Sequence, residues 1–284
     1  MEIALQIDAP SEPMLSVDCE SVYFGEAGCA ERFSFLDREG LLAAGLQQIR
    51  RAGKKAGLIA PMIVAEKDHG TVHDILERHL PLADRVLTAD LGLVAGFGGR
   101  VPMVFFGAVS NAHTAAVLVR RGVDRIRMSL PYTQPIRDVG ADADLEIVVF
   151  GSLPLSFTPT CHRLVMTGQG ACNPRCVDEE IVLRRGRHRL KVKAKSLVTE
   201  RPVNLTGRVR EVAPFVHTFV IDTTDLSVPQ VRRVVQAVRE ERAYVHDRKC
   251  FDGIRDCGDR DILSGRPWNQ TNPTLGGGGS CDCP

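Results

Sequence analysis

The chain has 284 residues, of which 44% are hydrophobic and 25% are charged, so we expect a sizeable folded core rather than extensive disorder. Its formal net charge of +1 gives no indication of a polyanionic partner. No apolar run approaches the roughly 20 residues that cross a bilayer, and the acidic start MEIALQIDAP does not resemble an export signal. We therefore expect a cytoplasmic protein without a membrane span.

Short, nearly continuous apolar runs alternate with segments of helical period along the first 150 residues. The expected strands are EIALQID (the weakest of the set), SVYFG, AGLIAPMIV, ADRVLTAD, VPMVFFGAVS, DRIRMSL and LEIVVFGSLPL. The expected helices are GLLAAGLQQIRRAG, TVHDILERHL and NAHTAAVLVRRG, whereas the glycine-rich LGLVAGFGGR predicts a turn. Strands covered on both faces and joined by helices are typical of parallel pairing with right-handed crossovers.

The alternation breaks between about residue 158 and residue 214. This insertion holds three cysteines and the basic run LRRGRHRLKVKAK, whose alternating charge predicts a hairpin or a small antiparallel sheet. The strand PFVHTFVIDTTD and the helix SVPQVRRVVQAVREERA follow it. We therefore predict an α/β fold: a (β/α) barrel over residues 1–243, complete or incomplete, with a cysteine-rich insertion after a late strand. An open doubly wound sheet is the alternative, and residues 244–284 form a polar, partly disordered tail.

Nine cysteines are many for a chain expected in a reducing compartment, where clustered thiols more often bind metal or carry redox chemistry. Cys29 follows the strand SVYFG, and Cys161, Cys172 and Cys176 follow the strand LEIVVFGSLPL. Loops after parallel strands gather at one face of a barrel, so these four thiols are expected to converge there. The spacing fits an iron–sulfur cluster or a tetrahedral zinc ion equally well. Buried thiols that act as small hydrophobes are the plainer alternative.

Two of these segments carry a resemblance to a known family. VYFGEAGCAERF and LEIVVFGSLPLSFTPTCHRL resemble strand-and-cysteine motifs of the collagenase-like peptidase family. TADLGLVAGFG and NAHTAAVLVRRGVDRIRMSL are similar to that family in character and order, and the resemblance covers roughly residues 20–240. Within the family, the likeness is to accessory proteins of oxygen-independent ubiquinone biosynthesis.

The resemblance implies a cofactor and partners. It assigns a 4Fe–4S cluster to Cys29, Cys161, Cys172 and Cys176. It also implies a paralogous partner subunit, a quinone precursor as the substrate and a prephenate-like oxygen donor. The chain would then be a subunit of an oxygen-independent hydroxylase. The tail departs from the family, because its thiols Cys250, Cys257, Cys281 and Cys283 have no assigned place.

Two other functions stay open at this stage. Other members of the family hydroxylate RNA bases, and the seven Lys and Arg residues from Arg184 to Lys195 would suit a phosphate backbone. We favour an exposed edge strand protected by lysines for this run, since it holds no aromatic side chain on which bases would stack. The other possibility is a non-catalytic scaffold with a structural zinc ion.

Several polar residues complete the candidate set. Asp222 and Asp225 end a predicted strand on the proposed active face. Arg125 and Arg127 would either clamp a carboxylate at the barrel mouth or form structural ion pairs, and we favour the ion pairs.

Three histidines are further candidates for metal binding. His69 and His73 are spaced i, i+4 without an HExxH motif, and we expect them to face solvent or cap a helix. His162 lies beside Cys161, where it would either tune a cluster or lie on the surface.

Overall fold

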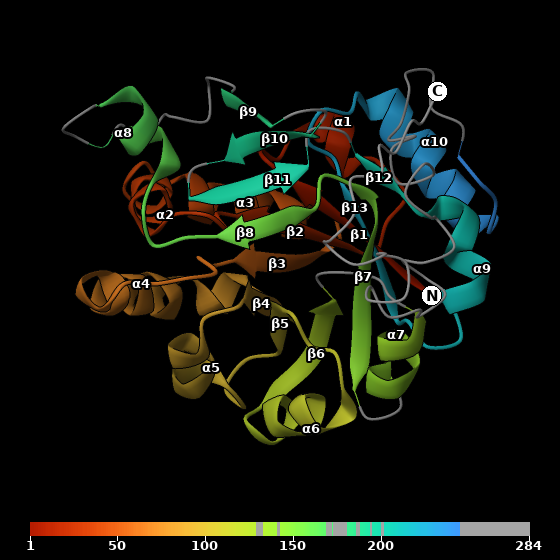
Figure 1. Ribbon diagram of the computed structural model, residues 1–284, viewed down its shortest axis with the longest axis horizontal. Helices are drawn as coiled ribbons and strands as arrows, with labels where there is room; N and C mark the ends of the chain where they lie inside the picture. Colours follow the sequence, from red (N-terminus) through yellow and green to blue (C-terminus); the bar gives the residue numbers. More distant parts are fainter. Residues whose placement is uncertain are drawn as a thin grey trace, which may run out of the picture.

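The computed structural model describes residues 1–128, 133–140, 143–168, 172, 181–185, 188–193, 195–199 and 202–244, and its centre is a closed parallel barrel (Figure 1). The eight barrel strands are β1 (Glu2–Ile7), β2 (Ser21–Gly25), β3 (Lys55–Ile59), β4 (Arg85–Thr88), β5 (Met103–Gly107), β6 (Val123–Met128), β7 (Asp144–Gly151) and β13 (Thr218–Asp222). They pair in chain order, and β6 pairs with β7 to complete the ring. The barrel predicted from the sequence is confirmed, and it is complete rather than open.

The strand at the start of the chain makes this closure possible. β1 pairs in parallel with β13 on one side and with β2 on the other, so it joins the last barrel strand to the second. Its residues Ile3, Ala4 and Leu5 are fully buried. A strand buried on both faces is expected for an element inside a parallel sheet.

Helices cover the outside of the ring. They are α1 (Glu12–Leu15), α2 (Ala30–Arg38), α3 (Leu41–Arg51), α4 (Glu66–His79), α5 (Leu91–Phe97), α6 (Ala112–Arg120), α7 (Thr133–Gly140), α9 (Val209–Val212) and α10 (Val228–Arg239), with 3-10 turns at Leu80–Leu82 and Thr206–Arg208. The predicted helix α6 begins at an asparagine cap, because the Asn111 side chain accepts from the Thr114 amide. No helix among the described residues combines the length and apolarity needed to cross a membrane.

The turn expected at LGLVAGFGGR is wrong, because its first seven residues form the helix α5. The Asp90 side chain caps this helix by accepting from the Leu93 amide at 3.0 Å. Leu93, Val94 and Phe97 are buried at helical spacing, and their burial outweighs the two glycines inside the helix.

The insertion contains a second sheet. Its strands are β8 (Pro154–Phe157), β9 (Ile181–Arg185), β10 (His188–Lys193) and β11 (Ser196–Thr199), paired antiparallel in the order β8-β11-β10-β9. The single strand expected over LEIVVFGSLPL therefore divides at Gly151: β7 stays in the barrel and β8 leaves it. The short strand β12 (Val203–Asn204) returns antiparallel to β7, and the helix α8 (His162–Thr167) lies between β8 and β9 in the chain.

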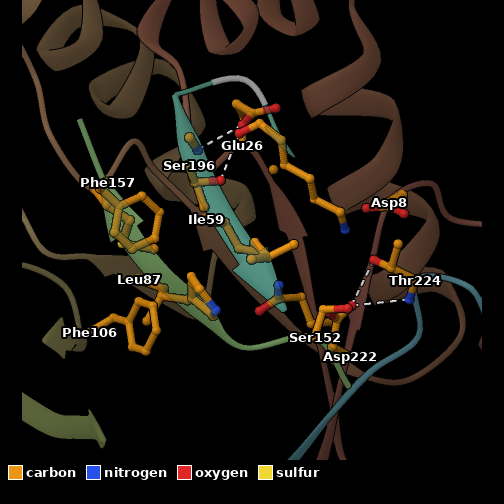
Figure 2. Close-up of a pocket in the computed structure, with 18 of the residues that line it drawn as sticks. Asp8, Glu26, Ile59, Leu87, Phe106, Ser152, Phe157, Ser196, Asp222 and Thr224 are labelled. Carbon is orange, nitrogen blue, oxygen red and sulfur yellow. Dashed lines mark hydrogen bonds between the residues drawn. The ribbon is translucent and has the colours of Figure 1, made fainter. Parts of the chain in front are cut away.

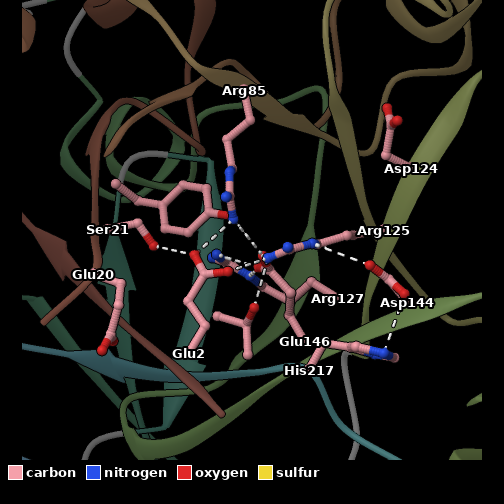
Figure 3. Close-up of polar contacts among 12 residues, drawn as sticks. Glu2, Glu20, Ser21, Arg85, Asp124, Arg125, Arg127, Asp144, Glu146 and His217 are labelled. Atoms are coloured by element: carbon pink, nitrogen blue, oxygen red, sulfur yellow. Dashed lines mark hydrogen bonds and ion pairs between the residues drawn. The ribbon is translucent and has the colours of Figure 1, made fainter. Parts of the chain in front are cut away.

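The barrel interior has a charged half and an apolar half. Glu146, on β7, is completely buried, and it lies opposite Arg127 in the pairing of β6 with β7. Arg127 donates to Glu146 Oε2 from Nε at 3.1 Å and from Nη2 at 2.9 Å. The Tyr23 hydroxyl donates to Oε1 at 2.6 Å, and Arg85 lies 3.5 Å from the same oxygen (Figure 3). Charge-assisted contacts of this kind compensate a carboxylate that water does not reach.

Both arginines form structural ion pairs, as favoured from the sequence. Arg125 contacts Glu2, Thr218 and Asp144 near the amino ends of the strands (Figure 3). Arg127 directs all three guanidinium nitrogens to Glu146 and Gln6.

Replacement of the central carboxylate tests this network. Glu146→Gln leaves Arg127, which is 1% exposed, without its buried counter-charge, so we expect a loss of about 3–5 kcal/mol in the free energy of unfolding. Urea unfolding followed by circular dichroism measures this loss. The control is Glu77→Gln, which removes the exposed ion pair with Arg100 and should change stability little. Equal effects of the two variants would contradict the role of Glu146.

The acid sensitivity of the barrel tests the pKa of Glu2. Burial opposes ionisation of this carboxyl, but hydrogen bonds from Ser21 and Arg125 and the charge of Arg85 outweigh it and lower the pKa from 4.5 to about 2. The stabilisation is therefore present above pH 4.5 and is lost as the pH falls toward 2. We expect wild type to lose more stability than Glu2→Gln when urea midpoints at pH 6 and pH 3 are compared. Equal losses would show that Glu2 makes no such contribution.

Candidate functional site

The loop after β2 places Cys29 at the carboxyl end of the barrel. Cys29 is the N-cap residue of α2 and is 5% exposed. Its thiol donates to Glu31 Oε2 at 3.0 Å. Lys195 Nζ lies 3.0 Å from the same oxygen, so one carboxylate joins α2 to the turn between β10 and β11.

The same turn lies beside the segment that carries Cys161. The Thr158 amide donates to the Lys195 carbonyl at 2.9 Å, and Cys161 follows three residues later as the N-cap residue of α8. Cys172 is exposed, and it interacts electrostatically with Glu31, Cys161 and Lys195. Thiols from two distant parts of the sequence therefore surround the Glu31–Lys195 pair.

Burial, together with the charges around this pair, favours the protonated form of the thiols. Burial raises the pKa of Cys29, and the hydrogen bond to Glu31 raises it further. Burial also raises the pKa of Cys172, with added contributions from Glu31 and Cys161. Both groups are thus neutral thiols at pH 7, and binding of a cation would be needed to favour their thiolate forms.

The predicted set of four thiol ligands is only partly covered by the structure. Cys176 lies outside the described residues, as do Cys250, Cys257, Cys281 and Cys283. Within the described ranges, no group of three or more His, Cys, Asp or Glu side chains is arranged to hold a metal ion. The cluster assignment therefore stays a prediction.

A cavity of about 300 Å³ lies beside the thiols, between the barrel strands and the small sheet (Figure 2). The loop of residues 25–28 lines it, so Cys29 directly follows a cavity wall. One side of the cavity is apolar and is formed by Ile59, Met62, Leu87, Phe106, Val148 and Phe157. Phe106 and Phe157 meet edge to face with ring centroids 6.1 Å apart.

The opposite side of the cavity is polar and carries two carboxyls, of which Asp222 is buried and Glu26 is partly buried. Glu26 forms an ion pair with Arg32 at 2.8 Å and accepts from the Gly28 amide. Asp222, at the end of β13, accepts from the Thr224 amide and hydroxyl. Burial raises the pKa of both carboxyls, and each also feels the charge of Asp8. Carboxyls with raised pKa in a cleft are frequent in functional sites.

Gly151 creates the space for Asp222. It ends β7 with a φ of 131°, a conformation that favours glycine. A Cβ atom at this position would lie 2.3 Å from Cβ of Asp222. The polypeptide therefore omits a side chain at the point where the Asp222 carboxyl enters the cavity.

The basic strand differs from the exposed edge predicted for it. β10 is paired on both sides, with β9 and with β11, and β9 is the edge strand. Lys191 and Lys193, two residues apart on β10, both line the cavity. Lys191 pairs with Asp225 at 2.8 Å. The period-two charge pattern thus marks a strand whose lysines face an internal polar surface.

The histidines contribute no metal site within the described residues. His73 is half-buried on α4 and stacks on Phe97 of α5 with ring centroids 4.7 Å apart, so it does not simply face solvent. His69, also on α4, lies close to Gly92 of α5. His162 Nε2 is 3.3 Å from the Thr158 hydroxyl.

Three polar residues of the site were not predicted from the sequence. Glu26, Glu31 and Asp8 were assigned no role, although Glu26 and Asp8 follow the ends of apolar runs. That position was the available signal, because side chains just after parallel strands face the mouth of a barrel.

The sequence matches no protein-family model and no curated protein. Solved structures with similar backbones include a U32 peptidase, with 12% identity over 78% of this chain and 92% of that chain and a TM-score of 0.47. They also include a ligand-free tryptophan synthase mutant from M. tuberculosis, with 12% identity over 84% and 92% and a TM-score of 0.47. The spore cortex-lytic enzyme SleL of Bacillus cereus aligns with 7% identity over 87% and 75% and a TM-score of 0.42. The activities in these names belong to those proteins, and the family resemblance stays a prediction.

Thiol labelling tests the burial of the cysteines. We expect iodoacetamide at pH 7.5 to modify the exposed Cys172 well before Cys19 and Cys29, since both of these are buried and burial raises their pKa values. Mass spectrometry of chelator-treated protein gives the rate at each site. Faster labelling of Cys29 than of Cys172 would contradict the burial of Cys29 and the exposure of Cys172.

Proposed function

We propose that this chain is an iron–sulfur protein of the collagenase-like peptidase family, similar to UbiV, that supports oxygen-independent hydroxylation of a ubiquinone precursor. In this proposal Cys29, Cys161, Cys172 and Cys176 hold a 4Fe–4S cluster. A paralogous subunit similar to UbiU completes the assembly, and a prephenate-like molecule supplies the oxygen.

The supporting observation is the position of three of these thiols. Cys29 and Cys172 share the electrostatic surroundings of Glu31 and Lys195, and Cys172 also interacts with Cys161, which is 132 positions from Cys29 in the sequence. Cysteine is the usual ligand of such clusters, so the donor set fits the group. A bound cluster would supply one-electron chemistry or activation of the oxygen donor.

Residues around Cys29 would hold the thiol and its neighbouring turn in place for the cluster. Glu31 accepts a hydrogen bond from the Cys29 thiol and so holds that side chain in one orientation. Lys195 balances the charge of Glu31 and fixes the β10–β11 turn against α2. The loop of residues 25–28 separates Cys29 from the cavity, so a molecule bound there would lie close to Cys29.

Iron content tests the proposal. Anaerobic purification should yield about four irons and four sulfides per chain, as expected for a Cys-ligated 4Fe–4S centre. Alanine at Cys29, Cys161, Cys172 or Cys176 should lower both counts and remove the EPR signal of the reduced protein. Cys19→Ala is the matched control, because Cys19 is buried among apolar side chains and should not affect either count.

Other results would support the alternatives. A zinc-loaded, colourless chain whose cysteine variants fail to fold would indicate a scaffold with a structural metal. Deletion of the gene under anaerobic growth separates the two hydroxylases: loss of the quinone supports the proposal, whereas loss of a hydroxylated RNA base with normal quinone indicates the RNA enzyme.

A further inference from the structure

Three charged groups of the cavity form no ion pair within the part of the chain that the structure describes. The ionisable side chains that line it are Asp8, Glu26, Arg32, Arg127, Lys191, Lys193, Asp222 and Asp225. Glu26 pairs with Arg32, Asp225 pairs with Lys191, and Arg127 pairs with Glu146 below the cavity. Among the described residues, Lys193 and Asp8 form no ion pair, and Asp222 accepts hydrogen bonds only from neutral groups of Thr224.

These three groups lie near one another. Asp222 interacts electrostatically with both Lys193 and Asp8. Asp222 is 5% exposed, and its carboxyl accepts hydrogen bonds from the Thr224 amide and hydroxyl, which hold it inside the cavity. The polar end of the cavity therefore offers one ammonium and two carboxyls at a site where a ligand would be desolvated.

The other end suits a ring-sized apolar group. Phe106, Phe157 and Leu87 lie together on one side in Figure 2, across the cavity from Asp8, Thr224 and Asp222. A volume of about 300 Å³ is at the lower end of the roughly 300–1,000 Å³ typical of small-molecule sites. The cavity thus fits a small molecule with an apolar body and one compact polar end.

We propose that the cavity binds a free α-amino acid with an aromatic or large apolar side chain. Its carboxylate contacts Lys193, its ammonium group contacts Asp222 and Asp8, and its side chain packs on Phe106 and Phe157. A ligand that is only anionic leaves the two carboxyls without a partner. A ligand that is only cationic leaves Lys193 without one. A zwitterion satisfies all three groups, because each opposite charge finds a partner in a water-poor site.

Calorimetric titration of the protein as isolated tests this proposal with four probes. L-Phenylalanine should bind, whereas phenylacetate, which lacks the ammonium group, and phenethylamine, which lacks the carboxylate, should bind at least about tenfold more weakly. Glycine, which lacks the ring, should bind more weakly still. Equal binding of phenylacetate and L-phenylalanine, or no binding of L-phenylalanine at millimolar concentration, would overturn the proposal.

Two variants test which side chain binds the carboxylate of the ligand and which binds its ammonium group. Lys193→Met should weaken L-phenylalanine and phenylacetate about tenfold and leave phenethylamine unchanged, and Asp222→Asn should weaken L-phenylalanine and phenethylamine but not phenylacetate. Lys55→Met and Asp74→Asn, at exposed positions outside the cavity, are the matched controls. Unchanged affinity in both cavity variants would also overturn the proposal. Iron and sulfide counts on the same samples report separately on the cluster, so the two proposals can fail independently.

Discussion

The closed barrel depends on the ion pair between the buried carboxylate of Glu146 and Arg127. Glu146 lies on β7, directly across from Arg127 on β6, and these are the strands whose pairing completes the ring. Its other partners, Tyr23 and Arg85, come from β2 and β4 on other parts of the circumference. A shift of one residue in any of these strands would turn its polar side chain to the outer face and leave a buried charge without a partner, which is far more costly than a shift in an apolar sheet. The network therefore favours one register around the whole barrel.

This choice of register also determines where a ligand site can form. The amino-terminal half of the interior is filled by long charged side chains, whereas Ile59, Leu87 and Val148 line the carboxyl-terminal half and leave a cavity above them. The small sheet covers that cavity because β8 leaves the barrel at Gly151. The ion pair of Lys195 with Glu31 then fastens the sheet to α2. One salt bridge thus holds both the cover of the cavity and the loop that carries Cys29.

Much of the fold was predictable from local patterns, and the site was predictable only where it follows strand ends. The apolar runs identified the barrel strands, and the position of Cys29 and Asp222 after such runs placed both at the carboxyl end. α5 was missed because its two glycines concealed three buried residues at helical spacing. The lysines of β10 were assigned to an exposed edge because their alternation does not reveal which face is covered. Partnerships such as Glu31 with Lys195, 164 residues apart, leave no local signal at all.

The loop of residues 25–32 joins the two sites that the structure brings together. Its first part, Gly25 to Gly28, lines the cavity, and Glu26 is held there by Arg32 from the first turn of α2. Cys29 lies between these two residues in the sequence and points instead to Glu31. A ligand that displaced Glu26 would therefore move Arg32 and the start of α2, and with them the Cys29 thiol. The Glu26–Arg32 pair holds the cavity wall and the Glu31–Lys195 pair holds the residues beside Cys29, so the cavity and the thiol share one short structural support.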